Sequence, residues 1–226
     1  MSAWSRFRAV LRLDWLLLAV LLGHSRVFFF SDWIAHDEGL LGQSAERILM
    51  GQLPHLDFDE MYSGGLSYLH AGAFRLLGVG VGTLREFHWW VSVAFAALSL
   101  QVGKRLFGSR WKALALVGIT TVWGPLNYPA SMPSWYVVYL STLAGALLAW
   151  SEGPKPSRVL TFTAGLAAGF APWIKVTGVF AVIGLGQLLI TRALPRTPKL
   201  LRLLPLLISC LCFLVVGEKL SIQSVI

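Results

Sequence analysis

Residues 13–34 read LDWLLLAVLLGHSRVFFFSDWI, an apolar stretch of the length that a membrane-spanning helix needs. Three arginines, Arg6, Arg8 and Arg12, precede this stretch. No small-residue cleavage site follows it, so the pattern disfavours a removable signal peptide. We therefore expect a first membrane helix that anchors the chain, with the N-terminus in the cytoplasm.

The composition of the whole chain points the same way. Of its 226 residues, 56% are hydrophobic and only 13% are charged, and the mean hydropathy is +0.66. Soluble domains carry about 25% charged residues, so this composition excludes a disordered chain and disfavours an ordinary soluble enzyme. The two cysteines, Cys210 and Cys212, lie in an apolar run and predict neither a disulfide framework nor a zinc site. The sequence favours an all-α polytopic membrane protein.

Further apolar segments and the basic residues between them predict the topology. We expect helices at residues 86–106, 113–126, 135–150, 159–190 and 203–216. Lys and Arg are retained on the cytoplasmic side, and they cluster at residues 6–12, 104–112, 155–158 and 192–202. Two clusters on one side are separated by an even number of crossings. Segment 159–190 should therefore cross twice, with its turn at Pro172 and Lys175, which gives about seven membrane helices.

Residues 31–83 form an acidic block. They hold seven of the eleven acids of the chain, opposed only by Arg47 and Arg75. This charge predicts a large first external loop. Within the loop we expect a short helix at residues 44–50, irregular chain from Pro54 onward, and a surface-lying amphipathic helix at residues 68–77.

The pair Asp37-Glu38 follows the first apolar stretch directly. A carboxylate at the membrane surface can accept a proton from a hydroxyl group or bind a divalent cation, and partial burial brings its pKa toward that of a general base. The alternative is that both are solvated loop acids.

Several short motifs follow one another between residues 37 and 178. They are Asp37-Glu38-Gly39, Ala45-Glu46-Arg47, Pro54-His55-Leu56-Asp57-Phe58, Phe74-Arg75-Leu76-Leu77-Gly78, Lys104-Arg105-Leu106-Phe107-Gly108 and Gly165-Leu166-Ala167-Ala168-Gly169, followed by Lys175 and Gly178. Their order and spacing resemble the GT-C glycosyltransferases that use polyprenyl-phosphate sugars, in particular protein O-mannosyltransferases and lipid A aminoarabinose transferases.

The resemblance implies a fold and an activity. It implies that residues 1–226 form a single transmembrane GT-C-like module, a bundle of about seven helices that lacks the C-terminal part usual in that family. It implies transfer of a sugar, with inversion, from a polyprenyl-phosphate donor to a hydroxyl of an extracytoplasmic glycan, lipid or protein. The expected location is the inner (cytoplasmic) membrane, and no nucleic acid is expected as a partner.

The resemblance assigns the essential carboxylate to Asp37, with Glu38 beside it. A donor phosphate needs cationic partners, and the external candidates are Lys175, Arg85 and Arg75. The alternative for Lys175 is that its ammonium group extends to the outer interface.

Further polar residues of the external loop could line the acceptor side of the site. These candidates are His36, His55, Asp57, Asp59, Glu60 and Tyr62. The alternative for the acidic residues 57–60 is a solvated turn.

The resemblance leaves a divalent cofactor, Mg²⁺ or Mn²⁺, open, with Asp37 and Glu38 as possible metal ligands. The family often has a second acid in the loop between its third and fourth helices. Residues 127–136 read NYPASMPSWY and contain no acid, so any metal has to rely on Asp37, Glu38 or the acids at 57–60.

Two other functions stay open. One is a transporter or flippase for a lipid-linked or anionic substrate, using Lys175 and Arg26 as charges within the membrane; no repeat of helices supports it. The other is a catalytically silent, truncated module. Arg26 is costly in lipid, and we expect it to face Asp32 or Glu86.

Overall fold

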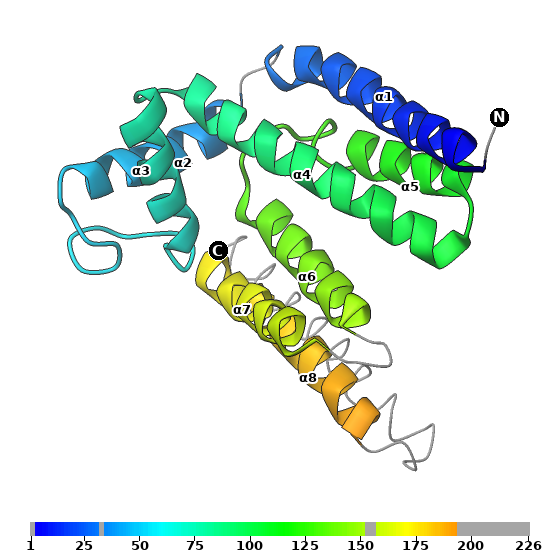
Figure 1. The fold of residues 1–226 in the computed structure, drawn as a ribbon. Coiled ribbons are helices and arrows are strands. Elements are labelled where there is room, and N and C mark those ends of the chain that lie inside the picture. Colours follow the sequence, from blue (N-terminus) through cyan, green and yellow to red (C-terminus); the bar gives the residue numbers. More distant parts are fainter. Residues whose placement is uncertain (1–2, 32–33, 152–156, 194–226) are drawn as a thin grey trace. The chain divides into compact units, whose positions relative to one another are not determined.

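The computed structural model describes residues 3–31, 34–151 and 157–193. The expected span 203–216, both cysteines, and Asp32 as a partner of Arg26 lie outside these ranges. The chain divides into two compact units, Met1–Trp135 and Tyr136–Ile226. Every regular element of the described part is helical (Figure 1), which confirms the all-α class.

The helices follow the predicted order, with shifted ends. The first unit contains α1 (Ala3–Phe29), α2 (Ala35–Leu49), α3 (Gly65–Leu77), α4 (Val81–Phe107) and α5 (Arg110–Val122). Then come α6 (Pro133–Trp150), α7 (Arg158–Ile174), the 3-10 helix η1 (Val176–Gly178) and α8 (Val179–Ala193). Among the described residues, no helix has both the length and the apolarity needed to cross a bilayer.

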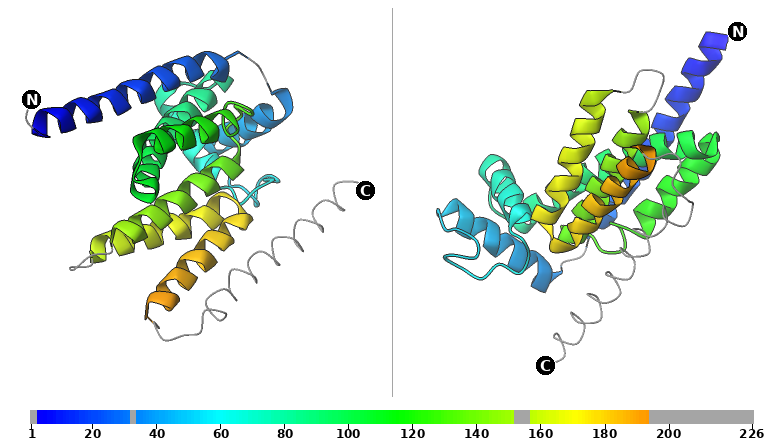
Figure 2. Two further views of the ribbon diagram at one scale, coloured as in Figure 1. Left: turned by 90° about the vertical axis from the view of Figure 1, so that its right-hand side faces the viewer. Right: turned by 90° about the horizontal axis from the view of Figure 1, so that it is seen from below.

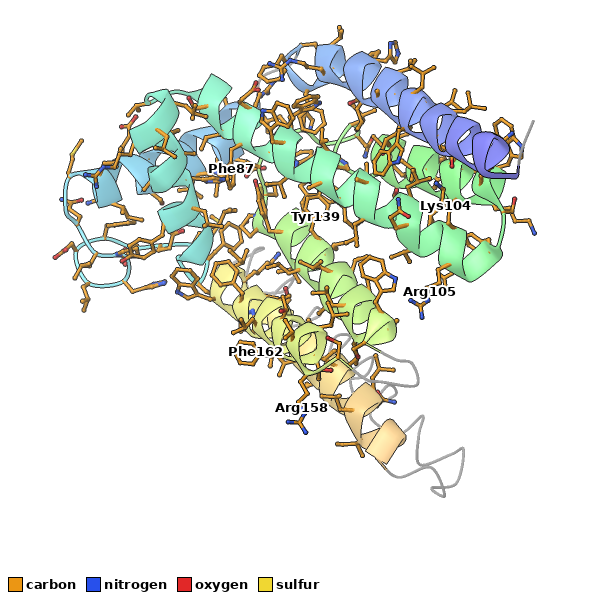
Figure 3. The ribbon with its side chains drawn as sticks, viewed as in Figure 1. Phe87, Lys104, Arg105, Tyr139, Arg158 and Phe162 are labelled. Carbon is orange, nitrogen blue, oxygen red and sulfur yellow. The ribbon has the colours of Figure 1, made fainter. Side chains whose placement is uncertain are left out.

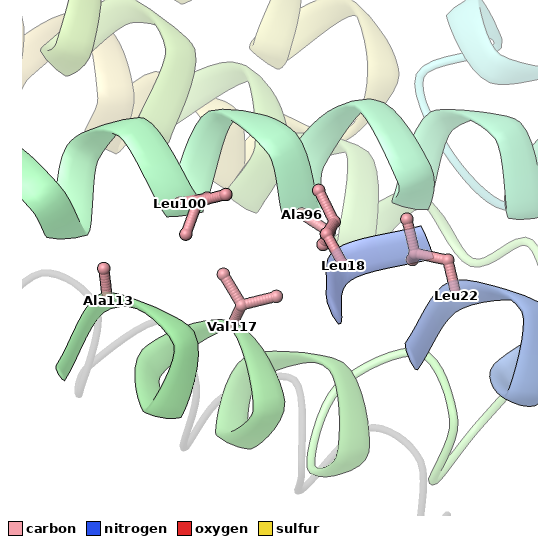
Figure 4. Packing of buried hydrophobic residues seen from close by; sticks show 6 residues of the cluster. All are labelled: Leu18, Leu22, Ala96, Leu100, Ala113 and Val117. Carbon is pink, nitrogen blue, oxygen red and sulfur yellow. The ribbon is translucent and has the colours of Figure 1, made fainter. Parts of the chain in front are cut away.

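Helix α4 is the central element of the first unit, because it contacts α1, α2, α3 and α5 (Figures 1 and 2). Its middle builds a buried apolar core with α1 and α5. Figure 4 shows this core, which consists of Leu18, Leu22, Ala96, Leu100, Ala113 and Val117. Small residues let α4 and α5 approach closely, since a Cβ on Gly103 would lie 2.9 Å from the Cα of Ala113.

Ion pairs join α1 to α4 at two places. Lys104 (Figure 3) places its Nζ 2.6 Å from the Oδ2 of the buried Asp14. Arg26 forms two hydrogen bonds to Glu86, of 3.1 and 2.7 Å, and its guanidinium lies 4.7 Å from the ring centroid of Trp89. The sequence-based expectation that Arg26 faces Glu86 is confirmed.

The start of α2 corrects the sequence analysis. We expected a helix only from residue 44, with Asp37 and Glu38 in a loop, but α2 begins at Ala35 and holds both acids in its first turn. The carboxylate of Glu38 accepts a hydrogen bond of 2.9 Å from the backbone N–H of Ile34. Acids in the first turn also interact favourably with the helix dipole. The same helix face buries Leu41 and Ala45.

The second half of the acidic block agrees with the prediction. Irregular chain runs from Gly51 to Gly64, and α3 covers the expected amphipathic segment. Leu66 and Phe74 are buried, whereas Leu76 and Leu77 are exposed near the end of the helix at Gly78.

In the second unit, α7, η1 and α8 confirm the turn predicted within segment 159–190. Helix α7 ends at Ile174, and Lys175 has an extended backbone before η1. The predicted position of Pro172 differs, because it lies inside the last turn of α7. Helices α6, α7 and α8 share a core of small and apolar side chains: Ala144, Leu148, Ala164, Ala167, Ala168 and Leu185.

Gly178 permits the tight turn between α7 and α8. A Cβ at this position would lie 2.2 Å from the carbonyl carbon of Ala171. Gly178→Ala is therefore expected to lower the free energy of unfolding by about 1–3 kcal/mol, the range for overpacked sites, measured as a lower melting temperature. Gly169→Ala in α7 is the matched control, because a Cβ there meets nothing within 4 Å. Equal melting temperatures for the two variants would contradict the assigned role of Gly178.

Candidate active site

A buried ion pair joins the beginnings of α2 and α4. The side chains of Glu38 and Arg85 are 0% and 5% exposed. Arg85 donates from Nε to Glu38 Oε1 at 2.5 Å and from Nη2 to Oε2 at 2.8 Å. Its Nη1 donates to the carbonyl of Phe29 at 2.9 Å, which adds the end of α1. The fork geometry of arginine suits such two-point contacts, so this pair fixes three helix ends together.

Asp37, next to Glu38, keeps part of its carboxylate accessible. Its side chain is 23% exposed. The hydroxyl of Tyr128, in the segment between α5 and α6, donates to Asp37 Oδ2. This hydrogen bond, followed by burial and the nearby carboxylates, raises the pKa of Tyr128 to about 12. The phenol therefore stays protonated and remains a hydrogen-bond donor at physiological pH.

Two more of the predicted residues gather near Asp37. Burial raises the pKa of Tyr62, and the negative charges of Asp37 and Glu60 raise it further. Glu60 accepts hydrogen bonds from Ser67 Oγ at 2.8 Å and from the backbone N–H of Tyr62 at 3.4 Å. The structure thus brings Asp37, Glu60 and Tyr62 into one electronegative neighbourhood.

The other candidates of the acidic block lie at the surface. His36 is 84% exposed, with Nδ1 3.3 Å from Asp37 Oδ1. His55, Asp57 and Asp59 are exposed residues of the irregular segment. Asp57 stabilises that segment itself, because its Oδ2 accepts a hydrogen bond of 2.7 Å from the N–H of Leu53. The exposure of Asp57 and Asp59 agrees with the alternative of a solvated turn, whereas Glu60 of the same stretch is buried.

The three predicted phosphate ligands have different surroundings. Arg85 uses its guanidinium on Glu38 and Phe29. Arg75 is exposed in the last turn of α3. Lys175 belongs to the second unit, between α7 and η1, and is partly buried.

The proposed metal ligands Asp37 and Glu38 do not fit a shared cation. Arg85 neutralises the carboxylate of Glu38 and occupies both of its oxygens. Within the described residues, no three His, Cys, Asp or Glu side chains form a group that could hold a metal ion. A divalent ion on Asp37 stays a prediction, and no chemical step below depends on it.

The sequence analysis did not identify two contacts made by residues 127–136. Besides Tyr128, Ser131 is buried, and its Oγ lies 2.8 Å from Nε2 of His70 on α3. We had searched this segment for a carboxylate, which it lacks. The hydroxyl groups of this segment were the signal from which these contacts could have been predicted, since a buried hydroxyl needs a hydrogen-bond partner.

His70 makes stability depend on pH. Burial lowers its pKa from 6.5 to about 3. Below pH 6.5 the unfolded chain therefore binds a proton that the folded chain does not, and stability falls as the pH falls toward 3. The contribution is at most about 1.4 kcal/mol per pH unit, measured by denaturant unfolding between pH 7 and 4.

A pair of variants tests this pH dependence. His70→Gln is expected to reduce the slope of the unfolding free energy against pH by an amount that corresponds to the uptake of up to one proton. His36→Gln is the control for the loss of a histidine, because the side chain of His36 is exposed, and His70→Gln should change the slope more than this control does. Equal slopes in the wild type and His70→Gln would contradict the prediction.

Comparison of the chain with protein-family models, with curated proteins and with solved structures gives no match.

Proposed function

We propose that this chain is a membrane glycosyltransferase of the GT-C type, which transfers a sugar from a polyprenyl-phosphate donor to an acceptor hydroxyl outside the membrane. One observation carries the proposal: the partly exposed carboxylate of Asp37 accepts a hydrogen bond from the hydroxyl of Tyr128, beside the buried pair of Glu38 and Arg85. A carboxylate that accepts a hydrogen bond from an O–H group in this way is suited to act as a general base.

The reaction divides the roles of the two acids. The acceptor oxygen attacks the anomeric carbon, and its proton passes to Asp37. The bond from the anomeric carbon to the phosphate oxygen breaks on the opposite side, and its electron pair leaves with the polyprenyl phosphate. Glu38 is a positioning residue, because its carboxylate is held by Arg85.

Cations near the surface are assigned to the donor phosphate. Arg75 keeps this role in the proposal, since the guanidinium of Arg85 is engaged by Glu38; the assignment of Lys175 stays a prediction. The carboxylates of Asp37 and Glu60 repel a phosphate, so we place the phosphate on the opposite side of the reacting sugar from Asp37.

The membrane location is part of the proposal. It is supported by the mean hydropathy of +0.66 and by the separation of acidic and basic segments along the chain. It is also supported by exposed apolar side chains on α1, including Leu16, Val20 and Val27, which are 61%, 63% and 68% exposed. Such side chains are compatible with a lipid environment.

Reconstituted vesicles test the proposal against its alternatives. The purified protein is given a panel of radiolabelled polyprenyl-phosphate sugars and mixed envelope acceptors, with and without a chelator. Label on an acceptor supports the transferase. Donor that crosses the bilayer without transfer identifies a transporter instead. Donor that binds without either outcome identifies a silent module.

A further inference from the structure

The segment that carries Tyr128 is fixed at several points to the rest of the first unit. The hydroxyl of Tyr128 donates to Asp37 Oδ2. The indole of Trp135 donates to the backbone carbonyl of Tyr128 at 3.2 Å. Three residues after Tyr128, Ser131 is hydrogen-bonded to the fully buried His70. Tyr128 therefore approaches Asp37 from an anchored backbone.

The two oxygens of Asp37 have different surroundings. Oδ2 accepts the hydroxyl of Tyr128. Oδ1 lies 3.3 Å from Nδ1 of His36, whose side chain is 84% exposed. Oδ1 thus lies beside an exposed side chain.

We propose that Tyr128 is the positioning residue of the candidate base: it holds Oδ2 of Asp37, so that Oδ1 receives the proton of the acceptor hydroxyl. The assignment of a proton transfer rests on the proposed function, whereas the hydrogen bond itself does not.

The contact is tested without an activity assay. The chain has five tyrosines, so their ζ-carbons can be labelled with ¹³C and observed by NMR at neutral pH, with Tyr128→Phe assigning the signal. In Asp37→Asn the Tyr128 signal should shift, because the carboxylate that accepts its hydrogen bond is lost. A Tyr128 signal that Asp37→Asn leaves unchanged would overturn the proposal.

Kinetics test the role in transfer. Hydrogen bonds to charged groups contribute about 1.5–3 kcal/mol, so Tyr128→Phe should lower kcat about 10- to 100-fold without raising the KM for the acceptor. The double variant Asp37→Asn/Tyr128→Phe should be no slower than Asp37→Asn alone. Tyr68→Phe, in the exposed part of α3, is the matched control and should keep the wild-type kcat.

The two proposals fail in different ways. If the wild type transfers sugar but Tyr128→Phe is equally active, the positioning role is wrong and the proposed function stands. If the wild type transfers nothing, the proposed function is wrong, the proton transfer assigned to Asp37 falls with it, and the NMR comparison alone decides whether Tyr128 holds Asp37.

Discussion

Replacing Arg85 by methionine should lower the free energy of unfolding by about 3–5 kcal/mol, the range for breaking one side of a buried ion pair. The substitution leaves the carboxylate of Glu38 fully buried without its cation. It also removes the donor to the carbonyl of Phe29. Glu38→Gln should have an effect of similar size, because the guanidinium of Arg85 then lacks its counter-charge. Denaturant unfolding measures both.

The double variant separates the ion pair from other effects. Glu38→Gln/Arg85→Met should lose clearly less stability than the sum of the two single losses, since no uncompensated charge remains. Glu86→Gln is the control, because its pair with Arg26 is partly exposed and such pairs contribute only about 0–1 kcal/mol. Strictly additive losses would show that the two side chains do not act as a pair.

Asp37→Asn should lower the rate of sugar transfer about 10²- to 10⁴-fold, the usual contribution of a general base. Asparagine has the shape of aspartate but cannot accept the proton. Asp37 is partly exposed, so the variant should fold and should bind the donor as the wild type does. The measurement is kcat with a saturating donor, with the melting temperature recorded on the same sample.

Glu46→Gln is the matched control for this substitution. Glu46 lies on the same helix, α2, two turns beyond the first, and its loss of charge should leave transfer unchanged. If Glu46→Gln and Asp37→Asn slow transfer equally, the charge of α2 and not the base would explain the effect.

Local patterns in the sequence predicted much of the helical order. Helix α3 ends at Leu77, the end expected for the amphipathic segment 68–77. The turn after α7 occurs at Lys175, as the charge distribution indicated. The contact of Arg26 with Glu86 followed from the cost of a lone charge among apolar residues. In each case the signal lies in a few neighbouring residues or in a strong physical penalty.

The arrangement of the candidate site could not be predicted from the sequence alone. The acidic charge of residues 31–83 predicted a loop. Ile34, at the start of α2, is not a residue that usually caps a helix, so it gave no signal of the helix that begins there. The sequence alone does not show whether Arg85 binds a phosphate or a buried carboxylate. The burial of Glu38 against Arg85 decides between these two roles. The contact between Tyr128 and Asp37 joins residues 91 positions apart, which no local pattern encodes.

The most direct test of the central claim is transfer of radiolabelled sugar from polyprenyl phosphate by the purified wild-type protein, with the anomeric configuration of the product determined. We expect a labelled acceptor whose new bond has the configuration opposite to that of the donor. A folded wild-type protein that binds the donor and yields no labelled acceptor with any sugar of the panel would contradict the account.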